Sequence, residues 1–446
     1  MPRVGTLTVG TLTVGTLIVG TLIGQAAYSR RRMGTMADTG LNMLGAYGDW
    51  AASLAGAGPA PFSLRNPRWT AVESWKTAAR AEVARLLCRP RGAEGRDIEV
   101  RDVRVHRTSE RGGVSIEEIS WQLPYGPRTE AVLLKPSGAR GRLPGFLALH
   151  DHAGNKYFGR RKITRTVEPL HQMMENHQGQ YYGGVAWANE LALRGFVVLV
   201  HDTFPFGSRR ILARDLPPYV VERLMGDPEA TREMEPEHLA STEPVRRYEV
   251  SAGEIDREII AYNAFAAQHE AVVAKSLFSA GLTWPGVTLC EDLAALSWLA
   301  SRPDVDADRL GCGGLSGGGM RTVYLAGMDE RIRCAFTAGF MTTWRDFCRN
   351  VSYTHTWMAY TPGLPALMDF PELLGLRAPL PSLVIATSED PLYTLAEVQR
   401  AGKILTEVYQ KAGAADAFQI TIYPGPHKFD LPMQQQAFAW TKKWLG

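Results

Sequence analysis

The stretch that decides the fold is Gly314-Leu315-Ser316-Gly317-Gly318, which matches the pattern G-x-S-x-G. An apolar strand is expected just before it, over 309–315, and a helix from Gly317 onward. A serine in such a tight strand-to-helix turn lies exposed above the sheet, at a helix N-terminus that favours a developing anion. The chain holds 44 glycines, so a glycine-rich turn with an incidental serine is the alternative. The flanking strand and helix favour Ser316 as a nucleophile.

A serine hydroxyl needs a general base, which an acid must hold in place. Asp390 follows an expected strand at 383–387, and His427 follows another at 418–423. Both residues would lie on loops at the carboxyl ends of their strands, which is where sites of parallel sheets form. We predict His427 as the base and Asp390 as the acid that orients it. Glu389 is the rival acid, which we expect to be a solvated loop charge.

An oxyanion produced at Ser316 needs two backbone N–H donors. The first is expected from Gly317, and the second from the loop that follows an apolar strand at 143–150. We predict Asp151 as that second donor, although this residue also brings a carboxylate near the site. His152 of the same loop is a candidate substrate-binding residue. An aromatic segment adds two more candidates, Trp344 and His355, for which ordinary packing is the alternative.

The rest of the chain alternates between strands and helices. Strands are expected within 97–136 and at 143–150 and 196–201, and helices at 66–88, 187–194, 291–301, 395–412 and 432–444. This order predicts an α/β fold with a mostly parallel, doubly wound sheet. Residues 203–285 do not continue this alternation of strands and helices, and they are expected to form a helical insertion that caps the sheet.

Residues 60–446 resemble the α/β-hydrolase superfamily, and more narrowly its acetyl xylan esterase-like and dienelactone hydrolase-like branch. Four pieces carry the resemblance: residues 149–156, residues 198–209, the motif at 314–318, and residues 378–383 leading to 389–392. The resemblance implies a triad of Ser316, Asp390 and His427, and ester hydrolysis through an acyl-serine. It also suggests a small-molecule or carbohydrate ester as substrate. A lactonase or a serine peptidase would use the same residues, and both stay open.

The first 35 residues stand apart from the expected 36–446 domain. Residues 4–23 repeat a pentapeptide four times, and Arg30-Arg31-Arg32 follows. Glycine and threonine recur too often for a membrane span. We expect a low-complexity tail or an upstream start and a cytoplasmic protein; secretion is the alternative if residues 1–26 act as a signal peptide.

Other classes of function have weaker support in the sequence. The formal charge is +3, so nothing favours a nucleic acid or a membrane as partner. The five cysteines form no C-x-x-C pair, and we expect neither a metal nor another cofactor. The glycines at 311, 313 and 317 loosely resemble a nucleotide-binding pattern, which leaves an NAD-type oxidoreductase as a remote alternative. The basic stretch at 160–162 is interpreted as a solvated loop. The sequence does not indicate an oligomeric state.

Overall fold

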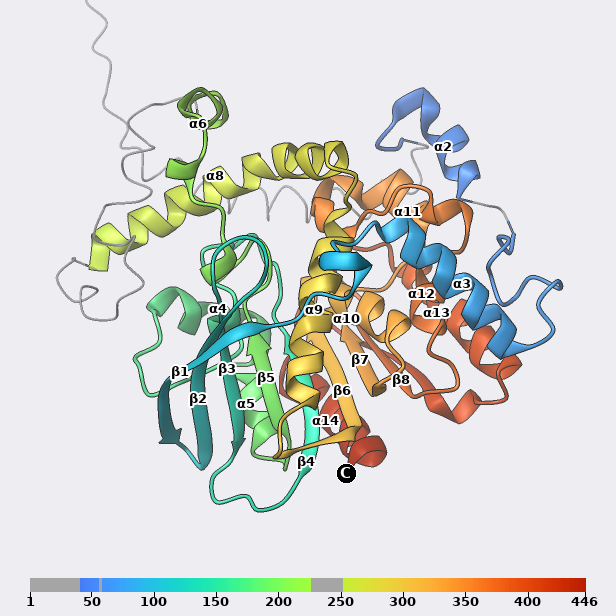
Figure 1. Cartoon of the computed structure of the whole chain (residues 1–446). Coiled ribbons are helices and arrows are strands. Elements are labelled where there is room, and N and C mark those ends of the chain that lie inside the picture. Colours follow the sequence, from blue (N-terminus) through green and yellow to red (C-terminus); the bar gives the residue numbers. More distant parts are fainter. Residues whose placement is uncertain (1–40, 56–57, 226–251) are drawn as a thin grey trace, which may run out of the picture.

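A sheet of nine strands forms the centre of the protein in the computed structural model, which describes residues 41–55, 58–225 and 252–446. The strands lie in the order β1-β2-β3-β5-β4-β6-β7-β8-β9 (Figure 1). From β1 to β5 in this order neighbours are antiparallel, and from β5 to β9 they are parallel. The predicted α/β class with a mostly parallel sheet is confirmed. The strands are β1 (Arg101–Arg111), β2 (Val114–Gln122), β3 (Thr129–Pro136), β4 (Leu143–Leu149), β5 (Val197–His201), β6 (Val305–Leu315), β7 (Ile332–Ala338), β8 (Ser382–Thr387) and β9 (Phe418–Tyr423).

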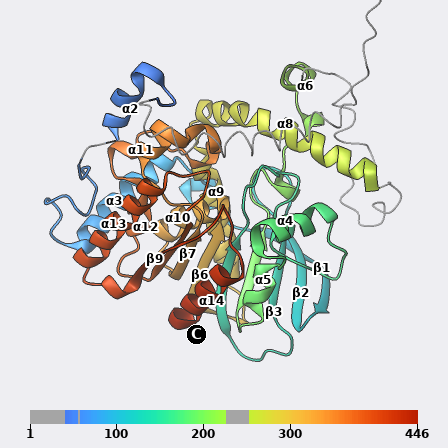
Figure 2. The same ribbon diagram turned by 180° about the vertical axis from the view of Figure 1, so that it is seen from behind.

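Helices cover both faces of this sheet. Because successive residues of a strand point to opposite faces, β4 supplies both cores. Leu147 and Leu149 pack in one core with α3, α9, α10, α12 and α13, whereas Phe146 and Ala148 pack in the other with α5 and α14. Figure 2 shows the second face, with α5 and α14 toward the viewer. The helices of the two layers are α3 (Val72–Leu87), α5 (Trp187–Ala192), α9 (Trp284–Ala300), α10 (Gly317–Met328), α12 (Phe370–Gly375), α13 (Leu395–Lys411) and α14 (Leu431–Leu445).

The segment after β5 carries α6 (Pro218–Met225) and the long helix α8 (Ala252–Ser279), within the range expected for an insertion. Helix α8 crosses above the sheet in Figure 1. Its Asn263 side-chain oxygen accepts hydrogen bonds from the amides of Lys156 and Tyr157, at 2.8 and 3.0 Å. Those amides belong to the loop that follows β4, so α8 covers the carboxyl end of that strand.

One strand and four α-helices of the structure were not expected from the sequence. They are the central strand β7, the helix α4 (Gln172–Tyr182), and the short helices α2 (Gly48–Leu54), α11 (Trp344–Asp346) and α12. Helix α9 begins at Trp284 instead of residue 291, because the Thr283 hydroxyl caps it by accepting a hydrogen bond from the Gly286 amide at 3.1 Å. The tail at 1–35 lies outside the described residues. No helix among the described residues is long and apolar enough to cross a membrane.

Among the strands of the described residues, β1 is the last at one edge of the sheet and pairs with β2 alone. Nearly all of its side chains are exposed, in contrast to the buried strands at the centre. The strand carries four arginines, at positions 101, 104, 107 and 111.

Candidate active site

Ser316 lies at the tip of the turn between β6 and α10, with φ 56° and ψ −120°. A positive φ is uncommon for a residue with a side chain and often marks a functional site. The serine is the only partly exposed residue between Leu310 and Gly327, so the turn lifts it out of buried surroundings. A Cβ atom on Gly314 or Gly318 would lie 2.2 or 2.0 Å from the carbonyl oxygen of Leu149. This crowding explains the two glycines of the motif.

The structure brings Asp390 and His427 together. Nδ1 of the histidine lies 2.6 Å from Oδ2 of the aspartate, and the loops that carry them are joined by a hydrogen bond from the Glu389 amide to the Gly425 carbonyl. Because the carboxylate accepts the proton on Nδ1, the other ring nitrogen, Nε2, is left unprotonated in the neutral ring and can accept a proton. The Glu389 side chain is exposed, as expected for a solvated loop charge.

The end of β7 places this pair beside the serine. The Ser316 amide donates to the carbonyl of Ala338 at 2.8 Å. The next residue, Gly339, leaves room for the histidine, because a Cβ atom there would lie 2.7 Å from Cε1 of His427. The same atom would lie 2.9 Å from Cδ1 of Leu315. Ser316 and His427 therefore lie at the same end of β7, with Ser316 bonded to Ala338 and His427 beside Gly339.

The charge of Asp390 sets the protonation of His427. Burial by itself would lower the pKa of this histidine, but the adjacent carboxylate outweighs burial and raises it above its usual value. A raised pKa makes the imidazole a stronger base and stabilises the imidazolium that forms when it takes a proton. The pair is therefore suited to general-base chemistry.

One amide of the loop after β4 lies beside the start of α10, and it belongs to His152. Its nitrogen lies 3.0 Å from where a Cβ atom on Gly317 would be. The predicted donor was Asp151. The N–H of Asp151 shares a peptide unit with the carbonyl of His150. That carbonyl oxygen lies 3.1 Å from where a Cβ atom on Gly318 would be, so it is on the side of α10. Because C=O and N–H of a trans peptide point in opposite directions, the Asp151 N–H points away from α10. The structure therefore favours the amide of His152, and not that of Asp151, as the second oxyanion donor.

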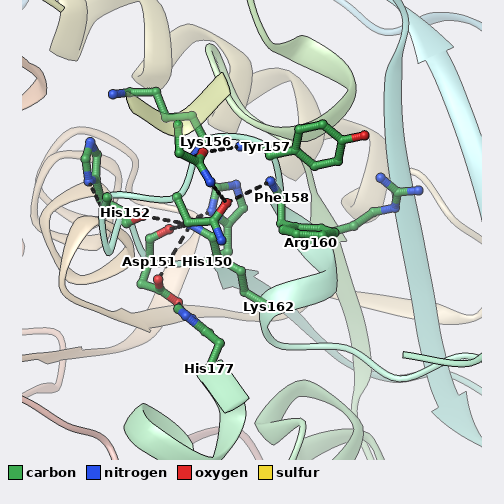
Figure 3. A network of polar contacts seen from close by, with 12 residues as sticks. His150, Asp151, His152, Lys156, Tyr157, Phe158, Arg160, Lys162 and His177 are labelled. Carbon is green, nitrogen blue, oxygen red and sulfur yellow. Dashed lines mark hydrogen bonds and ion pairs between the residues drawn. The ribbon is translucent and has the colours of Figure 1, made fainter. Parts of the chain in front are cut away.

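The Asp151 carboxylate lies beside His177 of α4 (Figure 3). It accepts hydrogen bonds from Nε2 of His177, at 3.1 Å, and from the hydroxyl of Tyr182. Although burial would raise the pKa of Asp151, His177 and Lys162 outweigh burial and hold it well below its usual value. This carboxylate anchors α4 to the loop, a role that the sequence did not suggest.

The imidazole of His152 is bound to the insertion. Its Nδ1 accepts from the Gly154 amide at 3.0 Å, which assigns the proton to Nε2, and Nε2 donates to Glu270 of α8 at 2.8 Å. The same Glu270 carboxylate pairs with Lys156 at 2.6 Å and accepts from the Thr356 hydroxyl at 3.0 Å. Burial would raise the pKa of Glu270, but His152 and Lys156 lower it. One carboxylate thus connects the insertion to two loops of the site.

The two predicted aromatic-segment residues have different surroundings. Trp344 is 4% exposed, packs with Phe347 and Phe370, and donates its indole N–H to the Met368 carbonyl at 3.1 Å. The structure favours the packing alternative for this tryptophan.

His355 lies closer to the histidine–aspartate pair. Its ring centroid is 5.0 Å from that of Phe347 and also 5.0 Å from that of Tyr393. Burial lowers the pKa of His355 to about 4, and the charges of Asp390 and His427 also act on it. This histidine is therefore neutral at physiological pH and remains a candidate for substrate binding.

The interpretation of 160–162 as a solvated loop is wrong. Arg160 pairs with Asp202 at 2.6 Å and also with Glu130, and the side chain of Lys162 is fully buried. The two acids that pair with Arg160 lie far away in the sequence, on β3 and after β5, so local composition could not reveal them.

The alternatives that rest on metal or nucleotide binding gain no support from the packing. In the part of the chain that the structure describes, no three histidine, cysteine or acidic side chains gather as metal ligands would. A Cβ atom on Gly311 would meet the ring of Phe146, and one on Gly313 would meet the ring of Phe336. These glycines make room for aromatic rings of the core.

Comparisons with known proteins place this arrangement among known folds. The model of the Prolyl oligopeptidase family matches residues 279–425, which include Ser316 and Asp390 and end just before His427. Over 378 residues the chain is 23% identical to YtaP of Bacillus subtilis (strain 168), a protein provisionally described as a hydrolase. That alignment covers 82% of this chain and 100% of YtaP.

Two solved structures share the fold over most of its length. The first is a Bacteroides fragilis protein provisionally described as an acetyl xylan esterase, with 15% identity, a TM-score of 0.58, and coverage of 85% of this chain and 83% of that one. The second is a glucuronoyl esterase from Solibacter usitatus, with 15% identity, a TM-score of 0.54, and coverage of 88% and 98%. The chain therefore has the α/β-hydrolase fold, and the predicted resemblance to that superfamily is confirmed.

Proposed function

We propose that this α/β-hydrolase is a serine hydrolase that cleaves carboxylic esters through an acyl-serine intermediate. The observation that carries the proposal is the position of Ser316, raised on a turn with positive φ, against the same end of β7 as the His427–Asp390 pair. These are the parts that nucleophilic acyl transfer requires: a nucleophile, a base, and an acid that orients the base.

In the proposed reaction, the Ser316 hydroxyl attacks the ester carbonyl while Nε2 of His427 takes its proton. Asp390 holds the imidazole by Nδ1 and stabilises the imidazolium. The amides of Gly317 and His152 donate hydrogen bonds to the oxyanion. The imidazolium then protonates the leaving alcohol, and a water activated by the same histidine cleaves the acyl-serine. No step in this scheme requires a cofactor.

Acetyl esters of carbohydrates are the substrate class that we propose first. The support comes from the structural neighbours, one provisionally described as an acetyl xylan esterase and the other named a glucuronoyl esterase. A serine peptidase is the second candidate, because the matching family model is that of prolyl oligopeptidases. The residues proposed for catalysis would be the same for both, so only substrates can separate the two activities.

The test is turnover of three substrates by the purified full chain: p-nitrophenyl acetate, acetylated xylan and a blocked proline p-nitroanilide. We expect ester turnover by the wild-type enzyme and a loss of several orders of magnitude in Ser316→Ala. The matched control is Ser301→Ala, at the exposed end of α9, which should keep the full rate. A Ser316→Ala variant as fast as the wild type would refute the proposal. Turnover of the anilide alone would assign a peptidase instead.

A further inference from the structure

A fully buried lysine lies beneath the loop that follows β4 (Figure 3). The ammonium group of Lys162 donates to two successive carbonyls, those of Asp151 and His152, each at 2.8 Å. It lies 4.8 Å from the centre of the Phe206 ring and 3.6 Å from the Asp151 carboxylate. Lysines are almost never fully buried unless their charge is compensated. The closest contacts of this lysine are backbone carbonyls, so its position is specific to the course of the loop.

The carbonyl of Asp151 and the amide of His152 belong to one peptide unit. That carbonyl accepts from Lys162 and also from Nδ1 of His150, at 3.0 Å. Two donors on one oxygen fix the plane of the peptide. Because the N–H of a trans peptide points opposite to its C=O, the His152 N–H is directed away from Lys162. Gly317 lies beside that nitrogen.

The charge of the lysine adds to its geometry. Burial lowers the pKa of Lys162 to about 8, so the amine remains mostly protonated at neutral pH. A cation on a peptide oxygen polarises the peptide and makes its N–H a stronger hydrogen-bond donor, more so in a buried site. Orientation and polarisation both favour donation to an anion at Ser316.

We propose that Lys162 is a positioning residue, which fixes and polarises the peptide whose His152 N–H stabilises the oxyanion. The inference rests on the proposed function and adds a residue that acts from below the loop, without contact with the substrate. It accounts for a buried cation that the acyl-transfer scheme itself does not use.

The test compares Lys162→Met, which keeps the length of the side chain but removes the donors, with Lys162→Gln, which keeps a neutral N–H donor. Losing one oxyanion donor costs about 10²–10³ in kcat, and a misdirected donor should cost less, so we expect Lys162→Met to lose roughly 10–100-fold with KM little changed. The affinity for a trifluoromethyl ketone, which forms a tetrahedral adduct with serine, should fall by a similar factor. Lys162→Gln should lose less than Lys162→Met in both measurements.

Active-site titration with a fluorophosphonate separates positioning from folding. A purely structural role would reduce the number of titratable sites and the melting temperature, but would leave kcat per site and ketone affinity unchanged; that result in Lys162→Met overturns the proposal. The matched control is Lys76→Met on α3, which removes another largely buried lysine, paired with Glu73 and Glu330. It should keep the wild-type kcat. Absence of ester turnover by the wild-type enzyme would instead refute the proposed function.

Discussion

At the scale of single residues, the bond from His427 Nδ1 to Asp390 determines which ring nitrogen can accept a proton. An asparagine at 390 would present an amide that can donate to Nδ1 and so favour the tautomer with its proton on Nε2. We expect Asp390→Asn to lower kcat for p-nitrophenyl acetate by about 10⁴, as the same change does in other triads. Steady-state kinetics checks this. Glu389→Gln, which changes the exposed neighbour, should keep the wild-type rate, and a similar loss in both variants would contradict the assignment.

The same pair predicts how the reaction depends on pH. The base must be neutral to take a proton, so kcat/KM should rise with pH through the pKa of His427 in the free enzyme. Asp390 raises that pKa above the usual value of a histidine, so the acid limb should lie above it as well. The Asp390→Asn variant lacks the charge that raises the pKa of His427. The acid limb of the pH–rate profile of its residual activity should therefore move to lower pH. A pH–rate profile of both proteins measures this, and an unmoved limb would show that another group controls it.

At the scale of elements, the close approach of β4 to the start of α10 depends on glycine. A Cβ atom on Gly318 would lie 2.0 Å from the Leu149 carbonyl oxygen, and neither backbone can move without shifting a strand or a helix. We expect Gly318→Ala to lower the melting temperature and abolish ester turnover. Gly179→Ala, in α4, is the matched control, since nothing lies within 4 Å of its Cβ position. It should raise the free energy of unfolding by about 0.5–1 kcal/mol. Equal effects of the two changes would contradict this steric explanation.

Helix α8 is attached to the site by a buried pair, Glu270 with Lys156. Glu270→Ala leaves the lysine buried without its partner, so we expect it to lower the free energy of unfolding by about 3 kcal/mol. The double variant Glu270→Ala with Lys156→Met removes both charges and should recover part of that loss. Urea unfolding of the three proteins checks the prediction. Glu222→Ala, an exposed glutamate of α6, is the control, and a double variant less stable than Glu270→Ala would argue against the pair.

At the scale of the whole molecule, several buried carboxylates keep their charge in the fold. The pKa values of Asp151, Asp292 and Glu270 all lie below their usual values. In the unfolded chain such groups take up protons near pH 4, whereas in the fold they resist protonation. Their contribution to stability is therefore complete above about pH 5 and is lost as the pH falls below about 4. Burial has the opposite effect on Glu372, Asp369 and Glu118, because it raises their pKa values, that of Glu372 to about 7. These three are outnumbered among the described residues by the carboxyls with a lowered pKa, which also include Asp102, Asp304, Asp306 and Glu330.

Urea unfolding at pH 6.5 and pH 3.5 tests this acid sensitivity. We expect a clearly lower unfolding midpoint at pH 3.5, with the same probe and ionic strength. A midpoint that is unchanged or higher would mean that these carboxylates gain nothing from their partners in the fold.

The sequence predicts the elements whose signals are local. Sequence patterns predict the motif around Ser316 and the strands before Asp390 and His427, because in each case an apolar run ends in a loop that carries polar residues. Strand β7 was missed because it is a short apolar run interrupted by Arg333. Helix α4 was missed because few apolar residues mark it; it is fastened by polar bonds from His177 and Tyr182 to Asp151.

The parts of the site that the sequence did not reveal depend on contacts between distant residues. Lys162 stands in a basic stretch that looks solvated, and its burial follows from the loop folded over it. Glu270 stands on a long helix of the insertion, more than a hundred residues from His152. The choice between the Asp151 and His152 amides depends on the direction of a peptide plane, which no residue pattern records.

The exposed edge strand β1 has a consequence for how the protein behaves when concentrated. An edge strand offers the backbone groups on its outer side to any extended segment, and edge pairing of this kind is a common route to aggregation. Strand β1 carries a net positive formal charge, from four arginines against Asp102 and Glu110, and a second copy that paired there edge to edge would bring the same charge. We therefore expect a second copy not to add to the sheet at β1, and the purified protein not to aggregate through this edge. The effect should be clearest at low salt, where charge repulsion acts over the longest distance.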